Sequence, residues 1–516
     1  MKKYIITLSI LFVCFGLFAQ GEMDAIRLSS SDLRGTARGQ AMGGAFGALG
    51  GDATGIMINP AGLGLYHSSE LNLSLPLNSN DIHTVWPTML QEESESSRFL
   101  IDNISFVGSF PTNNGNLQGL NFAFSYNRLK NFNRSYSVAR QAMNTSMTDY
   151  IAAITNGIYY EDMNFGSKYA GYDPYGNNKI PWLSTLGWLG YLIDDHPENS
   201  YSGLFPNERP VAGLKVNERG YIESGDFSFG GNWWNKLYLG LTVSVTDMFY
   251  HWDSSYEEKF AHGKIGLENY LETEGNGFQV KLGAIGRPFD FLRLGVAYHS
   301  PVWYYLTDYY QGSTTAVYPD VDEWAITPDD ALTHYRFHTP QTWVFSIAGI
   351  LGTKAIVSFD YELKDYKGMT VKDDRGLPKK DTNGFIEEDF KVASTLRAGL
   401  EYRFTPQFSG RLGYSYMQNP YEKTFKNGEK EVVIIGTIPH YTIAGDVNYF
   451  TAGMGYRFAS NFYVDMAFIY RTQKDDLYYF PSIFGADGDV RIKSTPASLT
   501  NRAYKGLVTV GYKFKN

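Results

Sequence analysis

Apolar and polar residues alternate with a period of two along most of this chain, and this pattern constrains the fold more than any other feature. In residues 120–127, large apolar side chains occupy every second position, and Asn121, Ser125 and Asn127 lie between them. Successive side chains of a β-strand point to opposite faces, so the pattern predicts a strand with one apolar and one polar face. We count fourteen such segments between Leu71 and Phe514.

Short and long connections alternate between these segments. The short ones are at 111–117, 232–235, 287–290, 352–354, 405–407 and 459–461. The long, polar ones are at 78–98, 129–220, 248–275, 301–334, 365–390, 418–445 and 472–503. Tight turns on one side and large loops on the other are typical of bacterial outer-membrane barrels, in which an even strand number places both ends in the periplasm. No stretch after residue 20 offers about eighteen consecutive apolar residues, so crossing a membrane would require strands.

Two further features favour a barrel over a soluble β-sandwich, which would bury its apolar face against a second sheet. The polar faces of the later strands carry charged residues that suit a wet lumen, namely Arg397, Glu401, Arg403, Arg411, Arg457, Asp465 and Arg471. The apolar faces end in aromatic pairs such as Tyr402 with Phe404 and Tyr512 with Phe514, which match an interfacial girdle. We therefore predict an all-β fold, a 14-stranded antiparallel transmembrane β-barrel.

The first twenty residues have the composition of a secretory signal peptide. Lys2 and Lys3 precede an apolar stretch, and the small residue Ala19 lies near its end. The single cysteine, Cys14, falls inside this segment, so the mature chain is expected to lack thiol chemistry and disulfides. The net charge of −9 argues against a nucleic-acid partner, which would need a basic face.

The segment 30–66 has a different composition from the strands. It is rich in Gly and Ala and ends in the motif Asn59-Pro60-Ala61-Gly62. Glycine reaches backbone angles that other residues avoid, and Pro60 keeps Asn59 out of helical space, so we expect compact irregular backbone. Such backbone needs partners for its polar groups, and the polar lumen of a barrel would supply them. We predict an N-terminal hatch at 21–68 and the barrel at 69–516.

The Gly-rich segment, the motif at 59–62 and the fourteen strands that follow resemble the FadL/TodX family of outer-membrane transporters for hydrophobic compounds. Residues 275–301 look like the central hairpin of that family, and the hairpins within 394–416 and 449–470 keep its pattern. The resemblance implies a monomeric barrel in the bacterial outer membrane, surrounded by lipid and lipopolysaccharide. It also implies that the hatch plugs the lumen and that long-chain fatty acids or aromatic hydrocarbons pass through by passive, hatch-gated lateral diffusion. We expect the lateral opening in the wall strand that begins at Gly119.

The loop 129–220 is the candidate entry structure, because it is much longer than a loop that only connects two strands. Met143, Met147, Tyr150, Ile151 and Ile154 recur at helical spacing, and residues 180–193 form a second apolar segment. We predict that five residues of this second segment help to line a substrate groove, namely Leu183, Leu186, Trp188, Leu189 and Leu192. The alternative is that they only pack the loop into a cap.

Three inward-facing arginines are candidate partners for a substrate carboxylate, since a guanidinium offers a planar pair of donors. They are Arg397, Arg411 and Arg471. Pairing with acidic neighbours is the competing interpretation, because Glu401, Asp465, Asp32 and Asp52 are available.

The sequence predicts no enzyme, no cofactor and no metal site. Motifs such as G-x-S-x-G and H-E-x-x-H do not occur, and His299 would face the lumen rather than an outer serine. His334 and His338 are four residues apart but are interpreted as rim residues. A receptor or adhesin barrel and a haemin-binding receptor remain as alternatives. The hatch discriminates between a transporter and an adhesin, because a conduit needs a hatch and an adhesin does not.

Overall fold

The protein was analysed as a computed structural model, which describes residues 21–85, 91–99, 101–112, 115–177, 179–328, 331–426, 428–434, 436–458, 461–485 and 489–514. The predicted signal peptide at 1–20, including Cys14, lies outside these residues.

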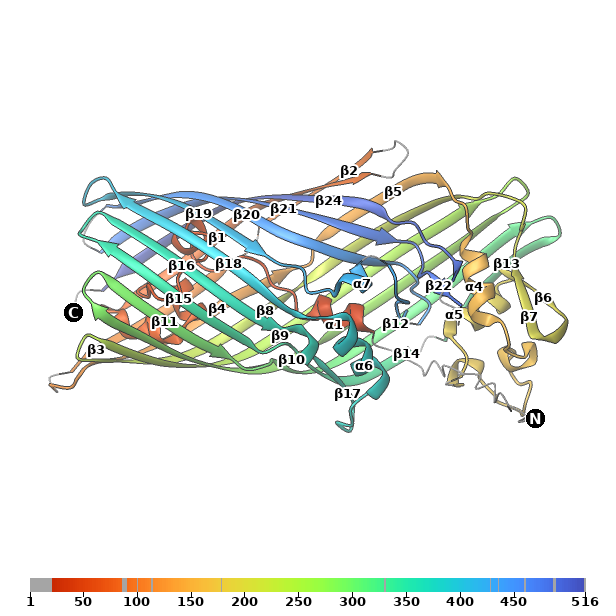
Figure 1. The fold of residues 1–516 in the computed structure, drawn as a ribbon, viewed down its shortest axis with the longest axis horizontal. Helices are drawn as coiled ribbons and strands as arrows, with labels where there is room; N and C mark the ends of the chain where they lie inside the picture. Colours follow the sequence, from red (N-terminus) through yellow and green to blue (C-terminus); the bar gives the residue numbers. More distant parts are fainter. Residues whose placement is uncertain are drawn as a thin grey trace, which may run out of the picture.

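A closed antiparallel barrel of fourteen strands surrounds the N-terminal segment, which confirms the predicted fold class (Figure 1). The first seven wall strands are β1 (Glu70–Val85), β3 (Asn103–Pro111), β4 (Leu117–Asn131), β8 (Val211–Trp233), β9 (Leu237–Lys259), β10 (Lys264–Phe289) and β11 (Leu292–His299). The other seven are β15 (Thr342–Leu351), β16 (Ala355–Asp365), β18 (Val392–Arg403), β19 (Phe408–Met417), β20 (Tyr441–Arg457), β21 (Phe462–Tyr478) and β24 (Ala497–Lys513). Each strand pairs with the next, and β24 closes the ring by pairing with β1 from Glu70↔Lys513 to Val85↔Ser498.

Four further strands continue the wall beyond interruptions. β2 (Gln91–Phe99) and β5 (Arg134–Ala142) follow the courses of β3 and β4, while β12 (Trp303–Tyr318) and β14 (Ala331–His338) extend β11 and β15. Pro301 and Pro340 lie in two of these interruptions. Proline has no N–H to donate, which explains why the ladder breaks at these residues.

The outer surface of the barrel is apolar where the alternation is strongest. Phe229 and Leu412 are exposed to 58% and 59%, and Phe124 to 48%, although all three are large apolar residues. A surface of this kind is unfavourable in water and favourable in contact with lipid.

The region expected to be a long polar loop at 248–275 is instead almost entirely strand, so this part of the prediction is wrong. β9 and β10 stay paired without a shift from Lys259↔Lys264 to Leu237↔Gly286. In this extension the apolar side chains point inward, as Trp252 and Leu267 do, whereas Asp253 and Glu268 point outward. The apolar and polar faces exchange sides here because the outer face of the strands no longer contacts lipid. Its polar residues were therefore interpreted as a loop.

The helices gather in two places. The hatch holds α1 (Glu22–Leu28), α2 (Ala37–Ala41), α3 (Ala53–Ile58) and the 3-10 helix η1 (Pro60–Leu65). The loop end of the barrel holds α4 (Met147–Thr155), α5 (Trp182–Leu189), α6 (Lys380–Asp389) and α7 (Lys423–Lys426), with the short 3-10 helices η2 (Tyr160–Met163), η3 (Pro174–Gly176), η4 (Pro197–Asn199) and η5 (Tyr366–Gly368). The small strands there are β6 (Ile193–His196), β7 (Ser200–Gly203), β13 (Val321–Ile326), β17 (Thr370–Asp373), β22 (Ile483–Phe484) and β23 (Val490–Ile492). Helices α4 and α5 correspond to the two apolar segments expected in the loop 129–220.

None of the helices in the described part of the chain is long and apolar enough to cross a membrane.

Candidate functional site in the barrel lumen

The hatch is built from very short helices that begin at side-chain caps. Thr36 caps α2 by accepting a hydrogen bond from the Gly39 N–H, and Asp52 caps α3 by accepting one from the Thr54 N–H. The Thr36 hydroxyl also donates to Asp52 Oδ1 over 2.7 Å, so the two caps support each other. Helices of five or six residues are unstable alone, which means that tertiary contacts hold them.

Asn59 connects the predicted hatch motif to both the hatch and the wall. Its Oδ1 accepts from the Ala61 N–H over 3.1 Å and starts η1. Its Nδ2 donates to the Gly47 carbonyl over 2.8 Å and to the Ala284 carbonyl of β10 over 3.2 Å. The buried amide thus joins three chain segments that are far apart in sequence.

Glycines in the wall make room for this motif. A Cβ added to Gly240 of β9 would lie 2.2 Å from the Pro60 carbonyl carbon, and one added to Gly283 of β10 would lie 2.0 Å from Asn59 Oδ1. Gly295 of β11 is equally close to the hatch, since its Cβ would lie 2.6 Å from the Gly47 oxygen. Three neighbouring strands therefore carry glycine where the hatch backbone touches the wall.

An ionic chain fastens the hatch to the opposite wall. Arg38 of α2 binds both carboxylate oxygens of Glu401 on β18, over 2.8 and 3.0 Å. Glu401 also accepts from Arg411 of β19 over 2.7 Å, and Arg411 reaches Asp465 of β21 over 2.6 Å. Two-pronged pairing of this kind is among the strongest contacts that an arginine makes.

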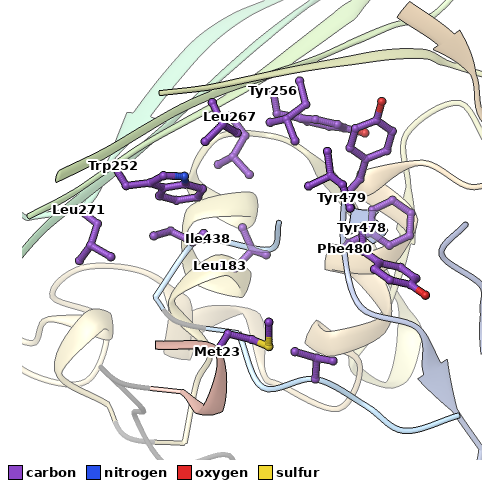
Figure 2. Close-up of a cluster of buried hydrophobic side chains, with 14 of the residues drawn as sticks. Met23, Leu183, Trp252, Tyr256, Leu267, Leu271, Ile438, Tyr478, Tyr479 and Phe480 are labelled. Carbon is purple, nitrogen blue, oxygen red and sulfur yellow. The ribbon is translucent and has the colours of Figure 1, made fainter. Parts of the chain in front are cut away.

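A cavity of about 350 Å³ lies between the hatch and the loop end of the barrel. Its apolar lining comes from α1, from the wall and from the loop between β19 and β20, and includes Met23, Trp252, Leu271, Val432, Val433 and Ile438. Figure 2 shows Met23, Trp252, Leu271 and Ile438 within one cluster of buried hydrophobic side chains. Charged residues also line it, among them Asp24, Arg27, Lys130, Arg134, Glu218, Arg471 and Asp475.

Helix α1 is tied to the loops above it through a buried carboxyl. Glu22 is fully buried, and its Oε1 accepts from the Val433 N–H over 2.9 Å. Its Oε2 has no hydrogen-bond partner among the described residues. Burial raises the pKa of Glu22 to about 8.

The cavity lies beside an interruption in the wall. The ladder between β1 and β3 ends at Ser74↔Asn103, and the one between β3 and β4 ends at Asn103↔Asn127. Beside this point Arg128 and Tyr504 line the cavity, although both occupy outward-facing positions of their strands. This interruption lies near the end of β4 that is far from Gly119, and a lateral opening in β4 stays a prediction.

The five predicted groove residues lie in the cap rather than along this cavity. Leu183, Leu186 and Leu192 are fully buried in its core, and Trp188 and Leu189 pack against that core. Trp188 Nε1 donates to Asn164 Oδ1 over 3.0 Å within the same loop. None of the five lines the large cavity in the described structure, and their role in substrate entry stays a prediction.

The three candidate arginines differ in their surroundings. Arg411 is engaged in the ionic chain with Glu401 and Asp465. Arg471 lines the large cavity and hydrogen-bonds to Gln473. Arg397 binds Glu362 with one Nη over 2.6 Å, whereas its buried Nη1 has no partner among the described residues.

The loop between β19 and β20 contributes to the cavity although no such contribution was predicted from the sequence. The apolar run that begins at Val432 was a usable signal, since such a run is unusual in a long external loop. Arg34 and Lys364 lie beside Arg397 at a smaller cavity of the lumen and were likewise not predicted, because the sequence carries no signal for such neighbours in space.

Comparisons with known proteins agree with this architecture. Residues 260–487 match a family model described as outer membrane protein transport protein (OMPP1/FadL/TodX). The crystal structure of a Pseudomonas aeruginosa FadL homologue is similar, with 14% identity, 94% of this chain and 99% of that chain covered, and a TM-score of 0.53. A deltaS2 mutant of the TodX monoaromatic hydrocarbon channel has 13% identity, coverages of 94% and 100%, and a TM-score of 0.51. No curated protein matches the sequence.

At these sequence identities, the solved structures show similarity of fold alone. The family model adds a match in sequence over residues 260–487. Together they confirm the resemblance drawn from the sequence: this chain is an outer-membrane β-barrel protein, and its residues 260–487 are similar to the OMPP1/FadL/TodX transport family.

Proposed function

We propose that this protein carries hydrophobic small molecules, such as long-chain fatty acids or aromatic hydrocarbons, across the outer membrane by passive diffusion. The substrate enters from the loop end, rests in the large cavity and leaves sideways through the wall beside β4. No energy source is needed, because an apolar path and a concentration gradient suffice.

The observation that carries this proposal is the cavity of about 350 Å³ with its apolar lining. Transport cavities and ligand sites are typically concave and mainly apolar, with a few polar groups that orient the ligand. Arg128 and Tyr504 also border this space, and in this proposal its contents reach the lipid beside them without crossing the hatch. A lateral route keeps a lipophilic molecule out of water, which favours it over release through the lumen.

In this proposal the hatch gates the route by moving relative to the wall. The centre of the hatch is held at Gly47, whose N–H donates to Asp360 over 2.9 Å and whose carbonyl accepts from Asn59. A covalent link at this point would prevent the hatch from moving without changing any residue that lines the large cavity. Ser346 of β15 is the wall residue beside it: a Cβ on Gly47 would lie 3.1 Å from the Ser346 Cβ, and a shift of about 0.5 Å brings the pair into the range of disulfides.

The test is the variant Gly47→Cys/Ser346→Cys, with Ser228→Cys/Thr242→Cys as its matched control. The control links β8 to β9, whose facing residues Ser228 and Thr242 have hydroxyls 2.7 Å apart, and leaves the hatch free. The only cysteine, Cys14, lies in the predicted signal peptide, so no other thiol competes.

Uptake of labelled oleate and toluene is measured in cells that lack the wild-type gene, before and after reduction. We expect oxidation to stop uptake in the hatch-linked variant only and a reductant to restore it. Undiminished uptake with the link intact would refute gating by the hatch. Failure of the wild-type protein to increase uptake of any probe would refute transport itself.

A further inference from the structure

The outer face of the barrel carries an open trough of about 310 Å³ across β8, β9, β10 and β12. Paired residues of these strands form two rows that line it. The row farther from the membrane is Lys215, Ser255, Glu268 and Ser313, and the nearer row is Asn217, Asp253, Tyr270 and Gln311. In the farther row two small serines alternate with two long side chains, which leaves the surface hollow.

The trough lies outside the level at which the wall contacts lipid. On the same outward face, Phe278, Trp303 and Tyr305 are exposed aromatic residues that mark the edge of the apolar band. Gln311 follows Tyr305 by six positions on β12, a rise of about 20 Å along the strand and about 15 Å along the axis of a tilted barrel. The sugars of lipopolysaccharide occupy this layer of a bacterial outer membrane.

Tyr270 is held in place by a polar network on the membrane side of the trough. Its hydroxyl donates to Glu272 Oε2 over 3.0 Å, and its ring meets the His251 ring edge-on with 4.9 Å between centroids. His251 is only 4% exposed although it occupies an outward position. Its Nε2 lies 2.6 Å from Asp253 Oδ2 and 2.8 Å from Arg219 Nη2. Neighbours that fix a side chain in this way reduce the entropy lost when a ligand binds to it.

The groups along the trough match the two faces of a sugar. A sugar ring has hydroxyls that both donate and accept and an apolar C–H face. Asp253 and Glu268 supply acceptors, and the amides of Asn217 and Gln311 supply both donors and acceptors. The ring of Tyr270 supplies a rigid apolar surface with a polar tip.

The charge of the surface selects among sugars. Three carboxylates, those of Asp253, Glu268 and Glu272, lie in or beside the trough, against the two cations Lys215 and Arg219. A phosphorylated sugar would therefore meet an excess of negative charge, whereas a neutral sugar would not.

We propose that this trough binds neutral sugars of the lipopolysaccharide core, with Tyr270 against a sugar ring and the Asp253 and Glu268 carboxylates accepting from its hydroxyls. The trough is continuous with the lipid-facing surface of the same strands. A lipopolysaccharide molecule whose acyl chains lie against the apolar band therefore reaches the trough with its sugars. This docking surface lies outside the lumen and does not depend on what the protein transports.

The probe is the core oligosaccharide that mild acid releases from the lipopolysaccharide of the organism that produces this protein. Its binding to immobilised, full-length, detergent-solubilised protein is measured by surface plasmon resonance, with and without EDTA. Ser255→Trp fills the trough. Val317→Trp is the matched control, because Val317 is an exposed residue on the same face of β12 that does not line the trough. A band shift on heating in detergent verifies that each barrel is folded.

We expect saturable binding to the wild type, none to Ser255→Trp and unchanged binding to Val317→Trp. Glu268→Gln should weaken binding by about tenfold, as expected for a lost hydrogen bond to a charged group. Tyr270→Phe should bind as the wild type does and Tyr270→Ala much more weakly, because the ring makes the contact. EDTA should have no effect.

Absence of saturable binding to the wild type, or equal binding to Ser255→Trp and Val317→Trp, would overturn the proposal. Loss of binding in EDTA would mean that the carboxylates hold a divalent cation, and the assigned sugar contact would be wrong. Competition by lipid A, which has phosphates and acyl chains but no core sugars, would refute it as well. None of these results bears on transport, because the trough and the large cavity share no residue in the described structure.

Discussion

A single methyl group at Gly240 should detach the hatch from the barrel wall. In Gly240→Ala the added Cβ would lie 2.2 Å from the Pro60 carbonyl carbon and 2.4 Å from the Ala61 nitrogen. These are backbone atoms, so no side chain can rotate out of the way. Ordinary contact begins at 3.4 Å, so the motif must retreat from the wall by about 1.2 Å.

A shift of this size breaks the contact between hatch and wall at Asn59. The hydrogen bond from Asn59 Nδ2 to the Ala284 carbonyl is 3.2 Å long at the outset, so a retreat of about 1.2 Å takes it out of range. Overpacking a close contact typically costs about 1–3 kcal/mol. The fourteen-stranded wall does not depend on this contact, so the barrel itself should remain folded.

The measurement is limited trypsin digestion at Arg34 and Arg38, together with oleate uptake and a heat-dependent band shift that reports barrel folding. We expect faster cleavage in the hatch and altered uptake with an unchanged band shift. Gly286→Ala is the matched control, since Gly286 lies on β10 with nothing within 4 Å of an added Cβ. If Gly240→Ala is digested no faster than Gly286→Ala, the docking of the motif against β9 is wrong.

Three further predictions address the hatch and the cap. Asn59→Ala removes the cap of η1 and the hydrogen bonds to the Gly47 and Ala284 carbonyls. We expect the hatch to lose about 1 kcal/mol or more of stability and oleate uptake to change, while the barrel still assembles. Unchanged trypsin digestion and unchanged uptake would contradict this. The raised pKa of Glu22, about 8 against an ordinary 4.5, means that the folded state holds this proton more tightly than the unfolded chain. Docking of α1 should therefore weaken as pH rises from about 4.5 through 8, and Glu22→Gln should abolish this dependence in hydrogen exchange; an identical pH profile in both proteins would refute it. Trp188→Ser/Leu189→Ser should reduce oleate uptake if the cap forms the entry groove, and unchanged uptake would leave these residues a packing role alone.

Much of the barrel was predictable because its signals are local. Each wall strand shows its two faces in consecutive residues, so alternation predicts the strand without knowledge of its neighbours. The same reasoning failed at 248–275, where the outer face of β9 and β10 carries Asp253 and Glu268 and the apolar face points inward. The outer face of this strand extension contacts water and is polar. A polar segment was interpreted as a loop because only strands with an apolar outer face were expected.

The candidate site was predictable only in part. The motif at 59–62 indicated a hatch, and Arg397 was correctly noted as facing the lumen. Whether an arginine has a free donor depends on partners elsewhere in the chain, however, as the pairing of Arg411 with Asp465 and the unpartnered Nη1 of Arg397 in the described structure illustrate. Spacing along the chain contains no information about such contacts.

The amino-acid sequence alone therefore determined the strand number, the β-barrel class and the presence of a plug, because periodicity and glycine content are properties of neighbouring residues. Only the tertiary structure decided which wall glycines receive the hatch, where the cavities lie and how the charged residues of the lumen pair. These features arise when residues hundreds of positions apart, such as Arg34 and Arg397, are brought to one place in the lumen. Closure of the barrel creates that proximity, and no local pattern encodes it.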